Sequence, residues 1–342
     1  MRRFHQFLGA FIGAVLILIF FLYFFDWKVT QRLLASSDLS TIITALAFLY
    51  TAILLRALKW TYILNLLETI PWKLGYHTIM ISNMLNFIFP VRLGELSKLY
   101  IVRKAGSIAY SSSLSATLTD RFSQLLTLMF FILFTPHAGF RFSQWIAKYT
   151  IFLFFIFTLT VSIFLFGEKI FSLLTNYLKK LFVFIRLDNS KIKSVLESRL
   201  YNFFHETIRK INIENYSMKH FFLIFLFSVV IVVVDGGCYY FLLSAFSLPI
   251  NWFQACLAAC FMNLTLILPS PPGLVGSAEM YPIVIFAWGL GLAVGAISTA
   301  AVLWHIITMS VFVLLGILST MNLGIDLIGT VRNLGREEIN VS

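Results

Sequence analysis

The sequence Asn86-Phe-Ile-Phe-Pro90-Val-Arg92-Leu-Gly94-Glu95 interrupts an apolar region of the chain. A second interruption, Asn263-Leu-Thr-Leu-Ile-Leu-Pro269-Ser270-Pro-Pro272-Gly273-Leu-Val-Gly276-Ser-Ala-Glu279, lies in the other half. Proline cannot continue a helix, and glycine adopts backbone angles that other residues avoid. Lipid tolerates broken backbone only where protein or water covers it. Paired interruptions at corresponding places in two halves therefore indicate a transport site near the middle of a bilayer.

The composition is that of a polytopic membrane protein. Hydrophobic residues make up 59% of the 342 residues, charged residues 12%, and the mean hydropathy is +0.89. A soluble domain carries about 25% charged residues. The formal net charge is +11. Because the basic residues cluster at the ends of apolar segments, we attribute this charge to membrane topology and to contact with anionic lipid, and we expect no nucleic-acid partner.

A membrane-spanning helix needs about 20 apolar residues. The full-length candidates are residues 8–25, 39–58, 110–134, 146–166, 219–246 and 293–320. The stretches 76–104 and 251–289 are also apolar but contain the two breaks, and we interpret them as re-entrant helical hairpins; the alternative is a kinked full span for each. We expect residues 1–342 to form a single all-α transmembrane domain of about six spans and two hairpins, with 8–25 as an uncleaved first helix.

The distribution of Lys and Arg predicts the orientation. With the N-terminus inside, the outer side carries only Lys28, Arg32, Arg141 and Lys148 of the 26 basic residues, and Arg121 lies within a span. The positive-inside rule then places both termini in the cytoplasm. The unit 39–134 is mirrored by the unit 219–320 in the opposite orientation, which predicts an inverted repeat. Basic and apolar residues alternate in the segment 167–218, which is typical of helices on the inner leaflet.

Ionisable side chains at membrane depth are costly and usually face a cavity. Near the first break, Arg92 and Lys98 suit a phosphate group, with Glu95 orienting them. The alternative is that Glu95 and Lys98, three apart on one helix face, pair with each other and that the cluster anchors a helix end at the interface. Asp120 and Arg121 point about 100° apart, so they do not form one pair, and one or both need a partner elsewhere. The polar run before them, residues 111–119, predicts a cavity-lining face.

Three further ionisable residues lie in apolar sequence. Glu279, just after the second break, is a candidate helix cap, a proton acceptor or a charge partner for Arg92 or Arg121. Asp235 is an intramembrane acid that needs a partner such as an Arg. His305 is interpreted as a hydrogen-bonded structural residue rather than a proton carrier.

The chain offers no convincing nucleophile–base pair, which favours a transporter over an enzyme. Cys256 and Cys260 share a helix face, but no third ligand joins them, so we expect no metal site and no cofactor. The expected substrate-binding residues are Asn86, Arg92, Glu95, Lys98, Asp120, Arg121, Asn263 and Glu279. The expected hairpin breaks are Pro90, Gly94, Pro269, Ser270, Pro272, Gly273 and Gly276.

Three motifs, in order, make residues 8–320 resemble the lysylphosphatidylglycerol synthetase transmembrane family, also described as flippase-like domain proteins. They are Asn86…Pro90-x-Arg92-x-Gly94-Glu95, Asp120-Arg121 within a span, and Pro269-Ser270-x-Pro272-Gly273-x-x-Gly276-x-x-Glu279. The family usually shows an acid-Arg-x-x-acid pattern in that span, and here Gln124 replaces the second acid. Pro271 stands where Ser or Gly is often found.

The resemblance implies a multi-pass protein of a bacterial or archaeal cytoplasmic membrane that handles lipids. In the best-known relatives this region moves an aminoacylated phospholipid between leaflets, and a separate soluble domain makes that lipid. This chain does not include that domain, so we expect no aminoacylation by the chain itself. The leading hypothesis is a flippase for an anionic phospholipid or a polyprenyl phosphate.

Two alternatives stay open. One is a membrane-embedded transferase acting on a lipid-phosphate carrier, with Glu95, Asp120 or Glu279 as the base. The other is an accessory subunit that positions a lipid-modifying enzyme or a cell-envelope glycosyltransferase. The substrate, the direction of movement and the coupling ion are not specified by the sequence.

Overall fold

The computed structural model describes residues 27–88, 94–132, 139–141, 158, 199–211, 217–265 and 271–325. Within these ranges all regular structure is helical, which confirms the predicted all-α class. Among the described residues, three helices are long and apolar enough to cross a membrane: α3 (Leu39–Asn65), α11 (Met218–Ser244) and α14 (Val294–Leu323). The predicted span 8–25 lies outside the described residues, as does 146–166 except for residue 158.

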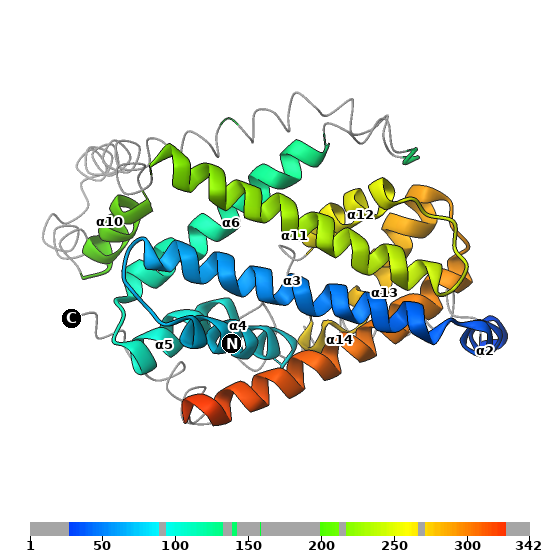
Figure 1. Cartoon of the computed structure of the whole chain (residues 1–342), viewed down its shortest axis with the longest axis horizontal. Coiled ribbons are helices and arrows are strands. Elements are labelled where there is room, and N and C mark those ends of the chain that lie inside the picture. Colours follow the sequence, from blue (N-terminus) through cyan, green and yellow to red (C-terminus); the bar gives the residue numbers. More distant parts are fainter. Residues whose placement is uncertain are drawn as a thin grey trace, which may run out of the picture.

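Helices α3 and α11 form an antiparallel pair at the centre of the molecule (Figure 1). At one end of the pair, the backbone N–H of Asp38 donates to the carbonyl oxygen of Ala245 at 3.4 Å. At the other end, the hydroxyl of Tyr62 contacts Nδ1 of His220 at 2.7 Å. The start of α3 therefore lies beside the end of α11, and the end of α3 beside the start of α11.

The chain reverses direction at the first break. Helix α4 (Trp72–Ile88) packs against α5 (Gly94–Gly106), and the hydroxyl of Ser82 donates to the carbonyl oxygen of Gly94 at 2.7 Å. In one continuous helix, residues twelve apart would be about 18 Å apart. A Cβ at Gly94 would lie 2.1 Å from the carbonyl oxygen of Ser82, so only glycine allows this approach.

The second break is an irregular segment between short helices. Helix α12 (Trp252–Thr265) precedes it, and η4 (Pro272–Leu274), α13 (Ser277–Pro282) and the π-helical turn η5 (Ile283–Trp288) follow. Gly273, Leu274 and Gly276 have φ angles of 70°, 56° and 81°. Two of these three positions are glycines, the residue type that tolerates the left-handed region.

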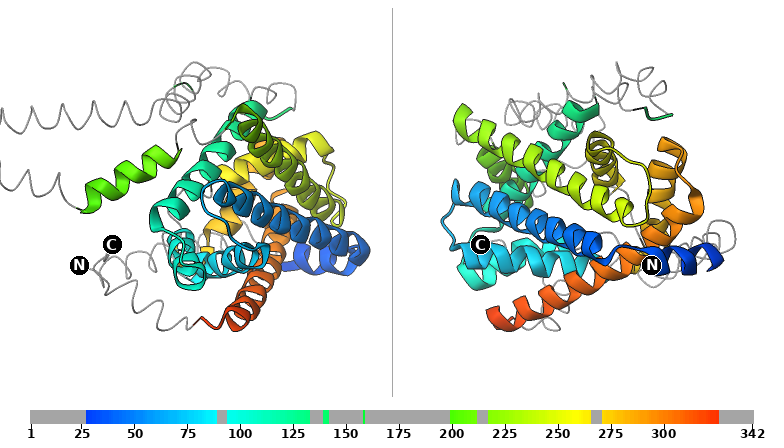
Figure 2. Two further views of the ribbon diagram at one scale, coloured as in Figure 1. Left: turned by 60° about the vertical axis from the view of Figure 1, so that its left-hand side comes forward. Right: turned by 45° about the vertical axis from the view of Figure 1, so that its right-hand side comes forward.

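The two broken segments lie toward opposite ends of the long helices. Figures 1 and 2 show α4 and α5 near one end of α3 and α11, and α12, α13 and η5 near the other. Helix α14 connects the two regions, since it packs along α4 and also contacts α13. Helix α6 (Tyr110–Ile132) lies against α3 and α11, and α10 (Arg199–Ile211) packs on α6.

Polar and apolar side chains are distributed as expected for a bundle surrounded by lipid. On α14, Ile306 and Leu314 are 60% and 59% exposed. In the interior, Lys59 and Asp120 are only 1% and 6% exposed. Apolar side chains thus face outward while charged groups are enclosed, which is typical of a membrane protein with a functional polar interior.

Candidate functional site

A cavity of about 280 Å³ opens between the two broken segments. Helices from both halves of the chain line it: α3, α4, α5 and α6 from the first half, and α11, α12, α13 and α14 from the second. A second cavity of about 300 Å³ adjoins it between α3, α6, α11 and α12. The residues that line both cavities are Arg56, Glu95, Arg121, Gln124 and Asn263.

Glu95, at the start of α5, links the first break to α6. One of its carboxylate oxygens accepts from Nζ of Lys98 at 2.8 Å, and the other forms an ion pair with the guanidinium of Arg121. The amide of Asn86 on α4 also donates to Glu95, at 3.4 Å. Nζ of Lys98 lies 5.7 Å from the ring centroid of Trp60 on α3. The segment after the break is thereby tied to three neighbouring helices.

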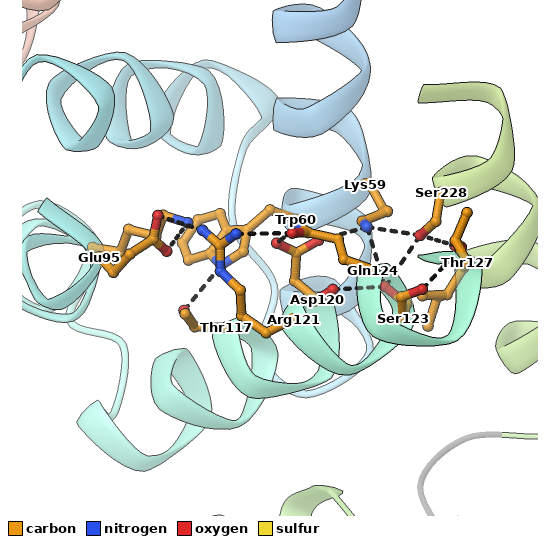
Figure 3. A network of polar contacts seen from close by, with 12 residues as sticks. Lys59, Trp60, Glu95, Thr117, Asp120, Arg121, Ser123, Gln124, Thr127 and Ser228 are labelled. Atoms are coloured by element: carbon orange, nitrogen blue, oxygen red, sulfur yellow. Dashed lines mark hydrogen bonds and ion pairs between the residues drawn. The ribbon is translucent and has the colours of Figure 1, made fainter. Parts of the chain in front are cut away.

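Asp120 is the centre of a second group of polar contacts, in which Asp120 and Lys59 are themselves buried (Figure 3). Its carboxylate pairs with Nζ of Lys59 on α3 at 2.7 Å, and Lys59 also donates to the hydroxyl of Ser228 on α11 at 2.8 Å. Gln124 donates to Asp120 at 2.9 Å and accepts from Arg121 at 2.8 Å. The amide of Gln124 therefore bridges the two groups, and adjacent Asp120 and Arg121 each have a charge partner on another helix, as their spacing predicts.

Asp235 on α11 pairs with Arg56 on α3 at 2.5 Å. The amide of Asn263 on α12 donates to the same carboxylate at 3.2 Å. This group joins the central helix pair to the helix that precedes the second break. Asp235 is thus the partner of an Arg, as the sequence indicated.

Glu279 and His305 form the group at the second break. One oxygen of Glu279 accepts from the backbone N–H of Gly276 at 2.7 Å, so Glu279 caps its own helix. Its other oxygen lies 2.6 Å from Nδ1 of His305, while Nε2 of His305 lies 2.8 Å from the carbonyl oxygen of Gly273. Capping is one of the three roles that the sequence left open for Glu279. Its charge partner is His305 rather than Arg121, which pairs with Glu95.

The two arginines around the cavities are more exposed than the acids they pair with. Around the cavities, the ion pairs of the described residues join Arg56, Lys59, Lys98 and Arg121 to three acids, and Glu279 to His305. The side chains of Arg56 and Arg121 are 30% and 36% exposed, whereas those of their partners Asp235 and Glu95 are 10% and 22% exposed. Lys59 and Lys98 are instead more buried than their partners, so the arginines are the accessible cations that line both cavities.

The structure brings most of the predicted substrate-binding residues to one place. Asn86, Glu95, Lys98, Asp120, Arg121 and Asn263 line the first cavity, and Glu279 reaches it through His305. Gly94, Pro272, Gly273 and Gly276 lie at the edges of the two breaks. The predicted residues Pro90, Arg92, Pro269 and Ser270 lie outside the described residues.

Sequence reasoning missed Arg56 and Lys59, which it assigned to the cytoplasmic end of a span closing at residue 58. Helix α3 continues to Asn65, so both side chains lie within the bundle. Their spacing could have indicated this, because two basic residues three apart in a helix lie on the same face and can both point into the bundle.

The polar run on α6 lines neither cavity, which corrects the prediction of a cavity-lining face for residues 111–119. Lys210 of α10 donates to the hydroxyls of Ser111 and Ser112 at 2.9 and 2.8 Å. Ser115 donates to the carbonyl oxygen of Thr207 at 2.8 Å. The start of α6 therefore binds α10, and the cavity begins at Asp120.

No group of three or more His, Cys, Asp and Glu side chains in the described ranges is arranged to hold a metal ion. A family model described as "Lysylphosphatidylglycerol synthase TM region" matches residues 6–316. No curated protein matches the chain.

Proposed function

The chain belongs to the family of the lysylphosphatidylglycerol synthase TM region, and from this premise we propose that it is a flippase that moves a phosphate-bearing lipid between the leaflets of a membrane. The observation that carries the proposal is the cavity between the two broken segments, walled by both halves of the chain and by paired charges. Discontinuous helices that meet at a polar cavity are typical of secondary transporters.

The size of the cavity supports a headgroup rather than a whole lipid as its occupant. A site that encloses a drug-sized ligand has a volume of about 300–1,000 Å³. The first cavity, at about 280 Å³, lies just below this range. We propose that the headgroup enters the cavity while the acyl or prenyl chains stay in the bilayer.

The accessible guanidinium groups support an anionic headgroup. Arg56 and Arg121 each retain about a third of their side-chain surface, and arginine binds phosphate through two parallel hydrogen bonds. Lys98 is a weaker candidate than the sequence indicated, because its side chain is only 4% exposed and its ammonium group is paired with Glu95. We therefore assign the phosphate to Arg56 and Arg121.

The arrangement of the helices supports an inverted repeat with two re-entrant hairpins. The first helices of the two units, α3 and α11, run antiparallel, and the broken segments lie toward opposite ends of this pair. The predicted units 39–134 and 219–320 each follow the order helix, broken segment, helix. In this proposal α10 lies on the cytoplasmic leaflet of the inner membrane, both termini are inside, and the hairpins open from opposite sides.

Reconstitution in liposomes tests the function. Labelled anionic phospholipid and labelled polyprenyl phosphate are supplied in separate vesicles, and transfer between leaflets is followed over time. We expect faster transfer for one of them and a loss of about tenfold or more in Arg121→Gln and Arg56→Gln, since a charged hydrogen bond contributes about 1.5–3 kcal/mol. Arg103→Gln is the matched control, because Arg103 is exposed and outside both cavities.

Transfer at the rate of empty liposomes for both lipids would contradict the proposal. Covalent product formed from a lipid phosphate and a sugar donor would instead identify a transferase.

A further inference from the structure

Both ring nitrogens of His305 face an oxygen atom that is normally an acceptor. Nε2 lies 2.8 Å from the carbonyl oxygen of Gly273, and Nδ1 lies 2.6 Å from a carboxylate oxygen of Glu279. A carbonyl oxygen only accepts, so Nε2 must carry a hydrogen. A second hydrogen must lie between Nδ1 and Glu279, because two lone pairs at 2.6 Å repel each other. The observed geometry therefore contains one proton more than a neutral imidazole beside an ionised carboxylate.

We infer that His305 and Glu279 together form a proton-binding site that holds the second break in place, and that a proton is the ion coupled to lipid movement. The coupling rests on the proposed flippase function, whereas the proton site rests on the contacts alone.

Loss of the extra proton removes one of the two contacts that His305 makes. If the remaining hydrogen stays on Nε2, the lone pair of Nδ1 faces the carboxylate of Glu279. If it moves to Nδ1, the lone pair of Nε2 faces the carbonyl oxygen of Gly273. Either outcome places two acceptors against each other next to the break, so the break is held less firmly when the site is empty.

The broken segment depends on these contacts because its backbone is irregular. Gly273 and Gly276 have φ angles of 70° and 81°, and Leu274 between them has 56°. The carbonyl oxygen of Gly273 faces His305, and the N–H of Gly276 donates to Glu279. The two residues of the proton site thus hold the segment at both ends.

No other charged group among the described residues that line the cavity competes for this proton. From α4, the ring of Phe87 stacks on His305 at 6.2 Å between centroids. From α13, Glu279 is the acid in contact, and Tyr281 lines the same cavity. The turn η5 carries no ionisable residue, and helix α2 (Trp27–Ser36) contacts α14 through Thr30 and Thr299, six residues before His305.

The remaining charges of the cavity are occupied with one another. Asp235 on α11 pairs with Arg56, and the acids on α5 and α6 pair with basic side chains on α3, α5 and α6. His305 lines the cavity and its side chain is 9% exposed, so water in the cavity gives a proton a path to the site.

Cysteine labelling tests the proton site without any lipid. Leu274→Cys places a thiol in the break, on the cavity wall, and the parent chain is the background because its three cysteines are buried. The rate of reaction with a small water-soluble maleimide is measured in detergent from about pH 5 to about pH 8, a range that brackets the titration of imidazole. The intrinsic increase in thiol reactivity is corrected with Trp72→Cys, an exposed site on α4. We expect the corrected rate to rise about tenfold with pH, the effect of losing one hydrogen bond of a charged group.

Two further variants test whether the pH dependence of labelling comes from His305 and Glu279. In Glu279→Gln the amide N–H donates to Nδ1 while its oxygen accepts from Gly276, so both contacts form without an extra proton and labelling stays slow at every pH. In His305→Phe, Gly273 loses its partner and labelling is fast at every pH.

A corrected rate that does not change with pH in the parent, or that changes equally in Glu279→Gln, would overturn the proton site. Lipid transfer assays in liposomes test the coupling of protons to lipid movement separately from the proton site. Transfer that does not respond to a pH gradient, together with pH-dependent labelling, would overturn the coupling and leave the proton site standing.

Discussion

The buried pair of Lys59 and Asp120 gives the sharpest prediction for stability. Lys59 is 1% exposed and uses its ammonium group on three partners, which are Asp120 at 2.7 Å, Ser228 at 2.8 Å and Ser123 at 3.1 Å. Lys59→Met fills the space of the alkyl chain but leaves the carboxylate of Asp120 with only Gln124 as a hydrogen-bond donor. Removing one partner of a buried ion pair costs about 3–5 kcal/mol.

The double variant Lys59→Met/Asp120→Leu removes both charges. Apolar replacement of a whole buried pair is often nearly neutral, and the amide of Gln124 then loses one partner, at a cost of about 1–3 kcal/mol. We therefore expect the double variant to be more stable than Lys59→Met by about 1–3 kcal/mol.

The free energy of unfolding is measured in mixed micelles with increasing dodecyl sulfate, followed by helical circular dichroism and by tryptophan fluorescence. Lys73→Met is the matched control, because Lys73 is exposed and its replacement should change stability by less than about 0.5 kcal/mol. A Lys59→Met variant within about 1 kcal/mol of the parent chain would refute the reasoning, because the expected loss is about 3–5 kcal/mol. So would a double variant less stable than both single variants.

Gly94→Ala should destabilise the first break far more than Gly106→Ala in a thermal unfolding assay. The new Cβ meets backbone at 2.1 Å in the first case and a flexible leucine side chain at 2.8 Å in the second; equal losses would contradict this. Asp38→Ala should lower the melting temperature of the protein near neutral pH, with a smaller effect in acid. Hydrogen bonds, the largest from Thr41, hold the pKa of Asp38 below its usual range, so its contribution is present above about pH 4 and is lost as the pH falls through the folded-state value. Lys210→Ala should speed hydrogen–deuterium exchange in α10 several-fold, because its ammonium group joins α10 to α6; unchanged exchange over residues 199–211 would count against that anchoring role.

The positions of the breaks and most of the charged residues of the cavity follow from the sequence. Proline and glycine in apolar sequence have few structural explanations, so the edges at Gly94 and Gly273 were predictable. It was also predictable that adjacent Asp120 and Arg121 would not form one pair, since a helix separates their directions by about 100°.

The depth of a charge is harder to read from sequence. A hydropathy window ends where charges begin, so Arg56 and Lys59 were predicted to lie at a helix end, whereas α3 continues to Asn65, with Lys59 buried and Arg56 lining the cavities. Their burial depends on acids from distant segments, Asp235 and Asp120, and pairing across 179 and 61 residues leaves no local pattern. The docking of α10 on the serines of α6 was missed for the same reason, because a polar face has the same sequence pattern whether it binds water or another helix.

Helix α14 contacts residues beside both breaks. It contacts α4 where Gly316 meets Met84 and where His305 stacks on Phe87, and the same His305 touches Gly273. A single helix, α14, thus contacts residues next to both interruptions of the backbone. A substitution at Phe87 would therefore alter the packing of His305, the residue that contacts Gly273 at the other interruption.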